Sequence, residues 1–211
     1  MNRLIIRPAS SLDGEQIARA AEIYRDSFPR HLRVPFDQLT GTGPRDQLHI
    51  GCAGDQPAGL AAVKRLETAG WTFLRYFAID PRRRREQLGL DLWQLLGEAI
   101  AADGWPDLVC FEVEDPAQAR DDAERRVREG RVGFWTRCGA VPLPVPGYVM
   151  PDFTGLAAAE PMLLMAASSA APQAQGERLA ALVLALYAER YGLPPADSLV
   201  TQALNSIPDR S

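Results

Sequence analysis

The chain has 211 residues, 46% of them hydrophobic, enough to bury a sizeable core in one domain with an appendage. Its formal net charge of −4 argues against general nucleic-acid binding, which needs a broad basic face. No stretch is apolar enough for a signal peptide or a membrane span, so we expect a cytoplasmic protein.

The first half of the chain predicts a helix and then a run of strands. A short strand at 4–7 precedes a helix that Asp13 and Gln16 can cap and that continues to about Phe28. Pro35 can open a short second helix. Strands at 47–53, 58–66 and 71–79, with turns between them, then predict an antiparallel meander.

The second half predicts a crossover followed by more helices and strands. Leucines at helical spacing indicate a helix from Gln87 to about Ala102, ending at Gly104, and a strand follows at 108–114. The crossover makes strands 71–79 and 108–114 parallel, with a ligand expected at their carboxyl ends. A charged helix is expected at 117–137, with Asp115 as its cap and its charges on a solvated face.

The chain changes character from about Ala170. A helix predicted at 173–191 and a shorter one at 197–204 are separated by two prolines. The longer helix has an apolar stripe that must be covered, by its own domain or by a second subunit in a possible homodimer. We therefore expect a domain at 1–170 and a helical extension at 171–211. The stripe consists of Leu179, Leu182, Val183, Leu186 and Tyr187.

Cysteines and histidines give little sign of metal binding. Cys52, Cys110 and Cys138 are far apart and include no C-x-x-C pair, so neither a disulfide framework nor a metal site is indicated. We expect Cys110 and Cys138 to be buried. Of the two histidines, His49 alternates within a predicted strand and is interpreted as structural, whereas His31 is a surface residue or a substrate contact.

Residues 79–89 combine the end of a strand, a proline corner and a helix start. Ile79-Asp80-Pro81 is followed by Arg82-Arg83-Arg84-Arg85 and then by Glu86-Gln87-Leu88-Gly89. A helix start offers free backbone N–H groups and the positive end of the helix dipole, and arginines beside it favour an anion such as a pyrophosphate. The alternative is a solvated charged loop.

This stretch resembles the acyl-CoA-binding motif of the GNAT superfamily of N-acetyltransferases, which reads hydrophobic-Asp-Pro and then R-x-x-G-x-G. Arg84 and Gly89 match, and Gln87 stands where the first glycine is usual. A Gln can still direct its N–H at phosphate if its φ and ψ are ordinary. Phe134-Trp135-Thr136-Arg137-Cys138-Gly139-Ala140 resembles the family's F-Y-x-x-x-G-F segment, and paired strands at 141–150 and 162–167 complete the order. The resemblance covers roughly residues 3–167.

The resemblance implies an α/β (α+β) fold with a mixed, mostly antiparallel sheet flanked by helices. It also implies acetyl-CoA as cosubstrate, without a metal, and a small-molecule amine as acceptor. The strand ending Phe77-Ala78-Ile79 would pair with the pantetheine arm, with Ile79 facing it, and the following turn would hold the pyrophosphate. The implied binding residues are Phe77, Ile79, Arg84, Arg85, Gln87, Leu88, Gly89 and Leu90.

The strand Cys110-Phe111-Glu112-Val113-Glu114 offers a general base. Its alternation puts Glu112 and Glu114 on one face of a strand that should be hydrophobic on both. Burial and a like-charged neighbour would each raise a carboxyl pKa toward that of a base for an ammonium group. Alternatively, Glu114 caps the next helix or pairs with Arg131 or Arg137.

The sequence evidence for a proton donor is less direct. The family often uses a tyrosine in the F-Y-x-x-x-G-F segment, but Trp135 stands there and cannot act as an acid. Tyr148 is the candidate replacement, or else a core or acceptor-site residue.

The favoured interpretation is direct attack of an amine on acetyl-CoA in a ternary complex. Two rivals remain: a GNAT-fold module that binds acyl-CoA or a partner without catalysis, and an acyltransferase that uses a longer-chain or carrier-protein thioester.

Overall fold

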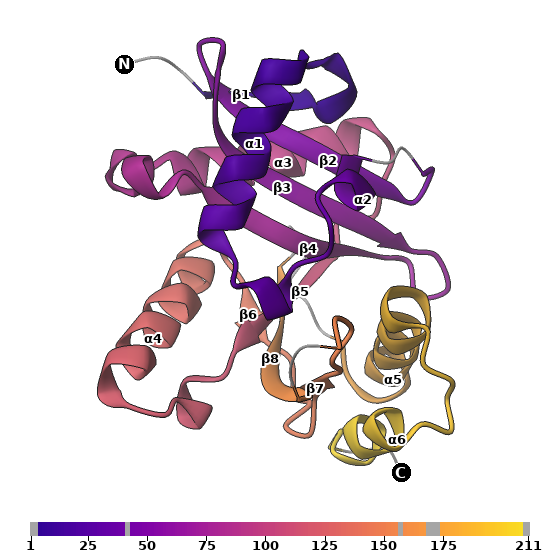
Figure 1. Cartoon of the computed structure of the whole chain (residues 1–211). Coiled ribbons are helices and arrows are strands. Elements are labelled where there is room, and N and C mark those ends of the chain that lie inside the picture. Colours follow the sequence, from indigo (N-terminus) through magenta and orange to yellow (C-terminus); the bar gives the residue numbers. More distant parts are fainter. Residues whose placement is uncertain (1–3, 41–42, 156–157, 168–173, 209–211) are drawn as a thin grey trace. The chain divides into compact units, whose positions relative to one another are not determined.

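The computed structural model describes residues 4–40, 43–155, 158–167 and 174–208. Its contacts divide the chain into two compact units, each described below by itself (Figure 1). Unit 1 comprises Met1–Arg65 and Leu74–Asp107, and unit 2 comprises Leu66–Phe73 and Leu108–Ser211.

The fold is mixed α/β and mostly antiparallel, as the sequence predicts. The described strands form an eight-stranded sheet in the order β1-β2-β3-β4-β5-β8-β6, and β7 pairs with β8. The strands are β1 (Leu4–Pro8), β2 (Asp46–Ala53), β3 (Gln56–Leu66), β4 (Trp71–Ile79), β5 (Val109–Glu114), β6 (Val141–Pro142), β7 (Val149–Met150) and β8 (Glu160–Ala167). The helices are α1 (Gly14–Ser27), α2 (Asp37–Thr40), α3 (Leu88–Ala102), α4 (Asp122–Arg137), α5 (Gly176–Ala185) and α6 (Ser198–Asn205).

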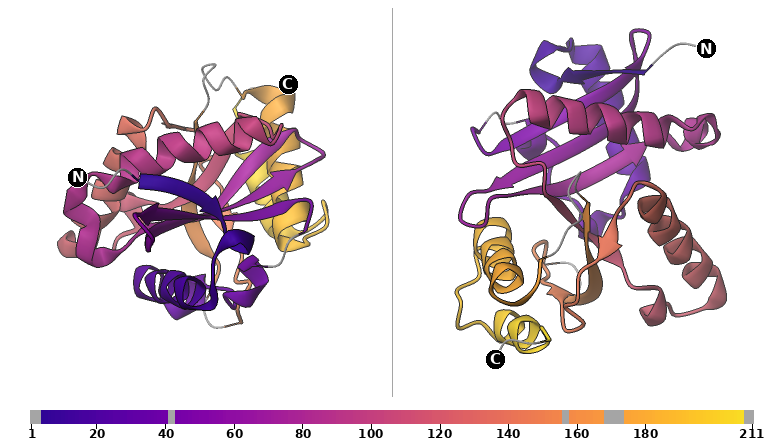
Figure 2. Two further views of the ribbon diagram at one scale, coloured as in Figure 1. Left: turned by 90° about the horizontal axis from the view of Figure 1, so that it is seen from above. Right: turned by 180° about the vertical axis from the view of Figure 1, so that it is seen from behind.

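In unit 1, helices cover both faces of the sheet. The predicted capping box is confirmed at the start of α1, where Asp13 accepts a hydrogen bond from Gln16 N at 2.8 Å. The views in Figures 1 and 2 place α1 and α3 on opposite faces of β1 to β3. Gly104, with φ of 67°, follows α3 as predicted. The short helix near Pro35 starts at Asp37.

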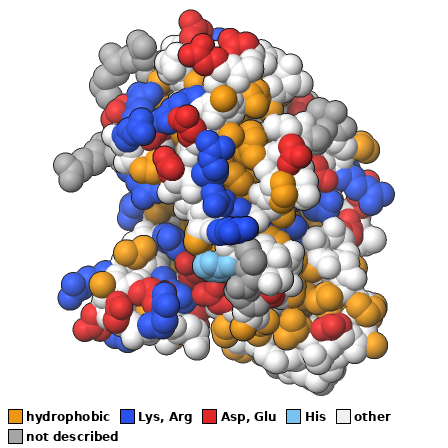
Figure 3. Space-filling model, in the orientation of Figure 1, with side chains coloured by type: hydrophobic (Ala, Val, Ile, Leu, Met, Phe, Trp, Pro, Cys, Tyr) orange, Lys and Arg blue, Asp and Glu red, His pale blue; other side chains and the backbone are white. Residues whose placement is uncertain are grey.

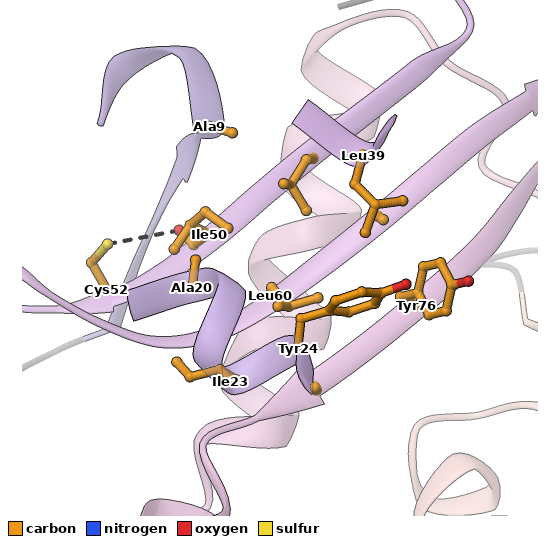
Figure 4. Packing of buried hydrophobic residues seen from close by; sticks show 12 residues of the cluster. Ala9, Ala20, Ile23, Tyr24, Leu39, Ile50, Cys52, Leu60 and Tyr76 are labelled. Carbon is orange, nitrogen blue, oxygen red and sulfur yellow. Dashed lines mark hydrogen bonds between the residues drawn. The ribbon is translucent and has the colours of Figure 1, made fainter. Parts of the chain in front are cut away.

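The core between α1 and the sheet is built around two tyrosines (Figure 4). Tyr24 of α1 and Tyr76 of β4 meet edge to face with ring centroids 4.9 Å apart. Both hydroxyls bond backbone groups of the segment after α1, Tyr24 to Val34 O and Tyr76 to Leu32 O. These bonds fix the chain that follows α1.

Unit 2 confirms the predicted parallel crossover. Thr72 and Phe73 of β4 pair in parallel with Val109 and Cys110 of β5. β5 then pairs antiparallel with β8 along its full length. The strand expected at 141–150 is interrupted and contributes only β6 and β7, each antiparallel to β8.

The charged helix departs from the prediction at its start. Asp115 caps a 3-10 turn at Pro116–Gln118, the chain is extended at Ala119, and α4 begins only at Asp122 because Asp121 caps it. Mixed charges cover α4, as expected of a solvated face (Figure 3). Arg128 is the exception, being only 6% exposed. It donates to Asp115 O at 2.9 Å and pairs with Glu124 and Glu160, so it joins α4 to β8.

The C-terminal extension packs within unit 2. All five residues of the predicted apolar stripe are fully buried. The helix starts at Gly176 rather than at 173, and continues from Leu186 to Arg190 as a π-helical turn. Tyr187 donates its hydroxyl to Val149 O at 2.7 Å. The predicted domain boundary at residues 170 and 171 lies outside the described residues.

Two further observations concern the described part of the chain. No helix in it is long and apolar enough to cross a membrane. Of the cysteines, Cys110 is buried as predicted, but Cys138 is only partly buried because it lies at the C-terminal end of α4.

Candidate functional site

The turn after β4 is organised by Asp80, which is only 5% exposed. Its carboxylate accepts from Arg82 N at 3.0 Å and forms an ion pair with Arg19 of α1. A 3-10 segment, Pro81–Glu86, follows and leads into α3. The turn is therefore held by α1, a contact that the local motif alone does not reveal.

Gln87 differs from the expectation of an ordinary backbone. It has φ of 59° and ψ of 8°, the single left-handed non-glycine among the described residues. It is the N-cap of α3, and its carbonyl accepts from Leu90 N at 3.2 Å. Left-handed geometry at a non-glycine costs about 1 kcal/mol or more, so the turn requires a positive φ even though the sequence supplies a side chain.

Replacing Gln87 with glycine should therefore stabilise unit 1. We expect the free energy of unfolding to rise by about 1 kcal/mol, because glycine adopts the left-handed region without penalty. The matched control is Gln94→Gly at an exposed position inside α3, which should lower it by about 1 kcal/mol. Urea unfolding of both variants measures the two signs. A loss of stability in both would show that the Gln87 side chain stabilises the turn.

The start of α3 has free backbone donors and exposed cations. The first-turn N–H groups of Leu88 and Gly89 have no intrahelical partner. Arg83 is paired with Glu86 at 2.7 Å, whereas Arg82 and Arg84 are exposed and have no acidic partner in the described part of the chain. Cations are thus available beside the positive end of the helix.

The remaining predicted binding residues have mixed exposure. Ile79 and Leu88, the first residue of α3, are buried in one apolar cluster, and Phe77 packs edge-on against Trp93 with ring centroids 6.4 Å apart. Ile79 can therefore offer a pantetheine arm its backbone rather than its side chain. Leu90 is 42% exposed, an unusual apolar surface residue beside the arginines.

In unit 2, Glu112 is the acceptor of a tyrosine cluster. Tyr148 donates to Glu112 Oε1 at 2.5 Å, and Tyr191 donates to both carboxylate oxygens at 2.7 Å. Burial raises the pKa of the Glu112 carboxyl, and the two hydroxyls and the Arg190 charge oppose the rise. The structure thus brings together two of the predicted site residues, Glu112 and Tyr148.

Tyr191 was missed by sequence reasoning. Its only sequence signal was its place at the end of the amphipathic extension, and no pattern in the sequence indicated that the extension returns to β5. Tyr148 is 1% exposed, whereas Tyr191 keeps part of its surface open. Tyr191 is therefore the member of the cluster that a substrate can reach.

Glu114 follows the alternative interpretation. It forms an ion pair with Arg131 of α4. Glu114 therefore lies apart from the tyrosine cluster, and its charge is balanced.

The other candidate residues are structural or exposed. Trp135 stacks on Phe111 of β5 with ring centroids 4.3 Å apart. His49 is buried, accepts or donates at 3.0 Å with Gln47, and has a pKa lowered by burial. His31 is exposed. Among the described residues, no group of three His, Cys, Asp or Glu side chains could hold a metal.

Comparison with known proteins identifies the fold. No protein-family model and no curated protein matches the chain. Solved structures do match. One described as a GNAT-family acetyltransferase from Bacteroides thetaiotaomicron aligns with a TM-score of 0.66 and 19% identity, over 90% of this chain and 99% of its own.

Two other matches carry activities in their names. An aminoglycoside 6'-N-acetyltransferase complexed with coenzyme A aligns with a TM-score of 0.57 and 14% identity, over 78% of this chain and 96% of its own. The ribosomal-protein-S18-alanine N-acetyltransferase of Escherichia coli has a TM-score of 0.52 and 18% identity, over 78% and 93%. The chain has the GNAT acetyltransferase fold, as the resemblance of its motifs implies.

Proposed function

We propose that this protein is an acetyl-CoA-dependent N-acetyltransferase that acts on the amine of a small molecule. The observation that carries the proposal is the turn from β4 into α3, where the first-turn N–H groups of α3 and the exposed Arg82 and Arg84 support a pyrophosphate site. The left-handed Gln87 does not meet the condition of an ordinary backbone and adds no support. The fold supports the proposal, because a matching structure contains coenzyme A and aminoglycosides are small-molecule amines.

Acyl transfer to an amine needs a base and a proton donor. An ammonium group must lose a proton before its nitrogen attacks the thioester carbonyl. The C–N bond then forms, the nitrogen loses a second proton, the C–S bond breaks, and the thiolate takes up a proton. Glu112 is suited to receive the first proton, because burial raises its pKa toward neutral.

Tyr191 is suited to pass protons between substrate and Glu112. It is the partly exposed member of the cluster, and its hydroxyl contacts both carboxylate oxygens. Tyr148 is a positioning residue in this scheme, because it is buried and holds Glu112 from the other side. The first ammonium proton leaves through Tyr191 to Glu112 and is released to water, and the second proton lost by the nitrogen balances the one taken up by the thiolate. No covalent enzyme intermediate is required.

The strongest rival is an acyl-CoA-binding module without catalysis. It is favoured by Trp135, which fills the usual tyrosine position and packs into the core. A bound CoA with no acyl transfer to any amine would support this rival. A longer-chain or carrier-protein thioester would instead show itself as a preference among acyl donors.

The nucleotide site is tested by the double substitution Arg84→Ala and Arg85→Ala. We expect CoA binding, measured by calorimetry, to weaken at least tenfold, or about 1.4 kcal/mol, because the arginine run that precedes the helix loses two positive charges; the side chain of Arg85 itself lies outside the described part of the structure. The matched control replaces Arg125 and Arg126 of α4 by alanine and should leave the affinity unchanged. Equal affinity in the folded Arg84/Arg85 variant would place the pyrophosphate elsewhere.

A further inference from the structure

Arg190 lies against two neighbouring aromatic rings beside the tyrosine cluster. Its guanidinium carbon lies 4.8 Å from the ring centroid of Phe153 and 5.1 Å from that of Tyr191. The π-helical turn Leu186–Arg190 sets this direction, and such turns occur frequently at functional sites. The two ring centroids are 5.8 Å apart, so both rings lie to one side of the guanidinium, whose N–H donors are left for other partners.

These N–H donors lack a partner within the described residues. Arg190 forms no ion pair or hydrogen bond there, and its Nε is buried without an acceptor. Glu189, its neighbour, is already engaged by the backbone N–H groups of Glu67 and Thr68. Glu112 interacts with Arg190 through its charge, but no acceptor among the described residues contacts the guanidinium, so its N–H donors are available to an anion from outside the chain.

We propose that Arg190 binds the carboxylate of the acceptor, so that the acceptor class is an amine that also carries a carboxylate, such as an amino acid. This inference rests on the proposed function. A fixed, planar guanidinium edge matches a carboxylate through two parallel hydrogen bonds. Tyr191 contacts Arg190 through its ring and Glu112 through its hydroxyl, so the anion site and the base are one tyrosine apart. A molecule with its amine and carboxylate a few bonds apart can occupy both.

Matched acceptor pairs test the proposal. The probes are α-amino acids and the corresponding carboxamides, each assayed for acetyl-CoA-dependent acetylation. We expect the wild type to favour the carboxylate member by at least tenfold in kcat/KM, chiefly through KM. Arg190→Gln should abolish that preference, which is a ratio of two rates and so does not depend on any change that the lost charge makes to Glu112. Arg178→Gln, an exposed arginine of α5, is the matched control and should keep the preference. A preference that survives Arg190→Gln, or none in the wild type, would overturn the proposal.

A phosphate of CoA is the other possible anion, and calorimetry separates it. We expect Arg190→Gln to keep the wild-type Kd for CoA; a loss of tenfold or more would assign Arg190 to the nucleotide instead.

A binding measurement separates this inference from the proposed function. In ¹⁵N-labelled protein, the Arg190 Nε–H resonance is identified by its loss in Arg190→Gln. Titration with the amino acids should shift it, and titration with the carboxamides should not. If the resonance shifts but the protein acetylates no amine, the carboxylate site stands and the proposed acetyltransferase activity is rejected. If the protein acetylates amines but the resonance does not shift, the acetyltransferase activity stands and the carboxylate site at Arg190 is rejected.

Discussion

Replacing Glu112 with glutamine should lower the turnover of an amine acceptor by roughly 10²-fold or more at neutral pH. The amide keeps the shape of the side chain but cannot take a proton. The deficit should shrink as pH rises, because a growing fraction of the acceptor is then already neutral. Initial rates of CoA release across pH measure the effect.

Two other carboxylates serve as comparisons. Glu114→Gln should have a much smaller effect, since Glu114 is paired with Arg131, and Glu129→Gln on the outside of α4 should have none. Wild-type rates for Glu112→Gln at every pH would mean that the base is elsewhere or is water.

The Glu112→Gln substitution should also change how the free energy of unfolding depends on pH. A carboxyl whose pKa is raised by folding is more easily protonated in the folded state, so the wild type should lose stability as pH rises from about 4.3, the ordinary Glu value, through the raised value. Glu112→Gln should lack this loss. Urea unfolding at several pH values compares the two curves.

Removing residues 172–211 should leave a protein that aggregates or does not fold. Residues 172 and 173 lie outside the described residues, but the five residues of the apolar stripe are described and are fully buried in unit 2. Each such side chain contributes about 1.5–3 kcal/mol by burial, so five together approach the 5–15 kcal/mol that stabilises a typical domain. The hydrogen bonds of Tyr187 to Val149 and of Tyr191 to Glu112 are also lost.

A milder change keeps this prediction testable if the truncated chain cannot be purified. Leu182→Ala should lower the free energy of unfolding by about 2–5 kcal/mol, and Glu177→Ala, on the exposed side of α5, should change it little. Solubility, size-exclusion elution and Tm report the outcome. A truncated protein with unchanged Tm that stays soluble would make the extension a passive appendage.

The sequence predicted the fold well because its signals are local. The capping box at Asp13, the leucine period of α3 and the parallel crossover from β4 to β5 each follow from residues close together in the chain. The predicted start of α4 was wrong because the sequence offers two capping aspartates, Asp115 and Asp121. Only Asp121 leads into a continuous helix.

The site could be predicted only in part because its partners are distant in sequence. Alternation singled out Glu112, but the contact with Tyr191 spans 79 positions and depends on the path of the extension. The buried state of Arg128 depends on Glu160 of β8 in the same way. The left-handed Gln87 was missed because a glutamine carries no signal for a positive φ.

The central claim is acetyl transfer from acetyl-CoA to an amine, and one measurement tests it most directly. The intact protein is incubated with acetyl-CoA and a panel of small-molecule amines, and free CoA and acetylated amine are quantified together by mass spectrometry. We expect equal amounts of both products with at least one amine, and a rate that falls with Glu112→Gln. CoA that binds but yields no acetylated amine across the panel, with wild type and variant alike, would contradict the claim.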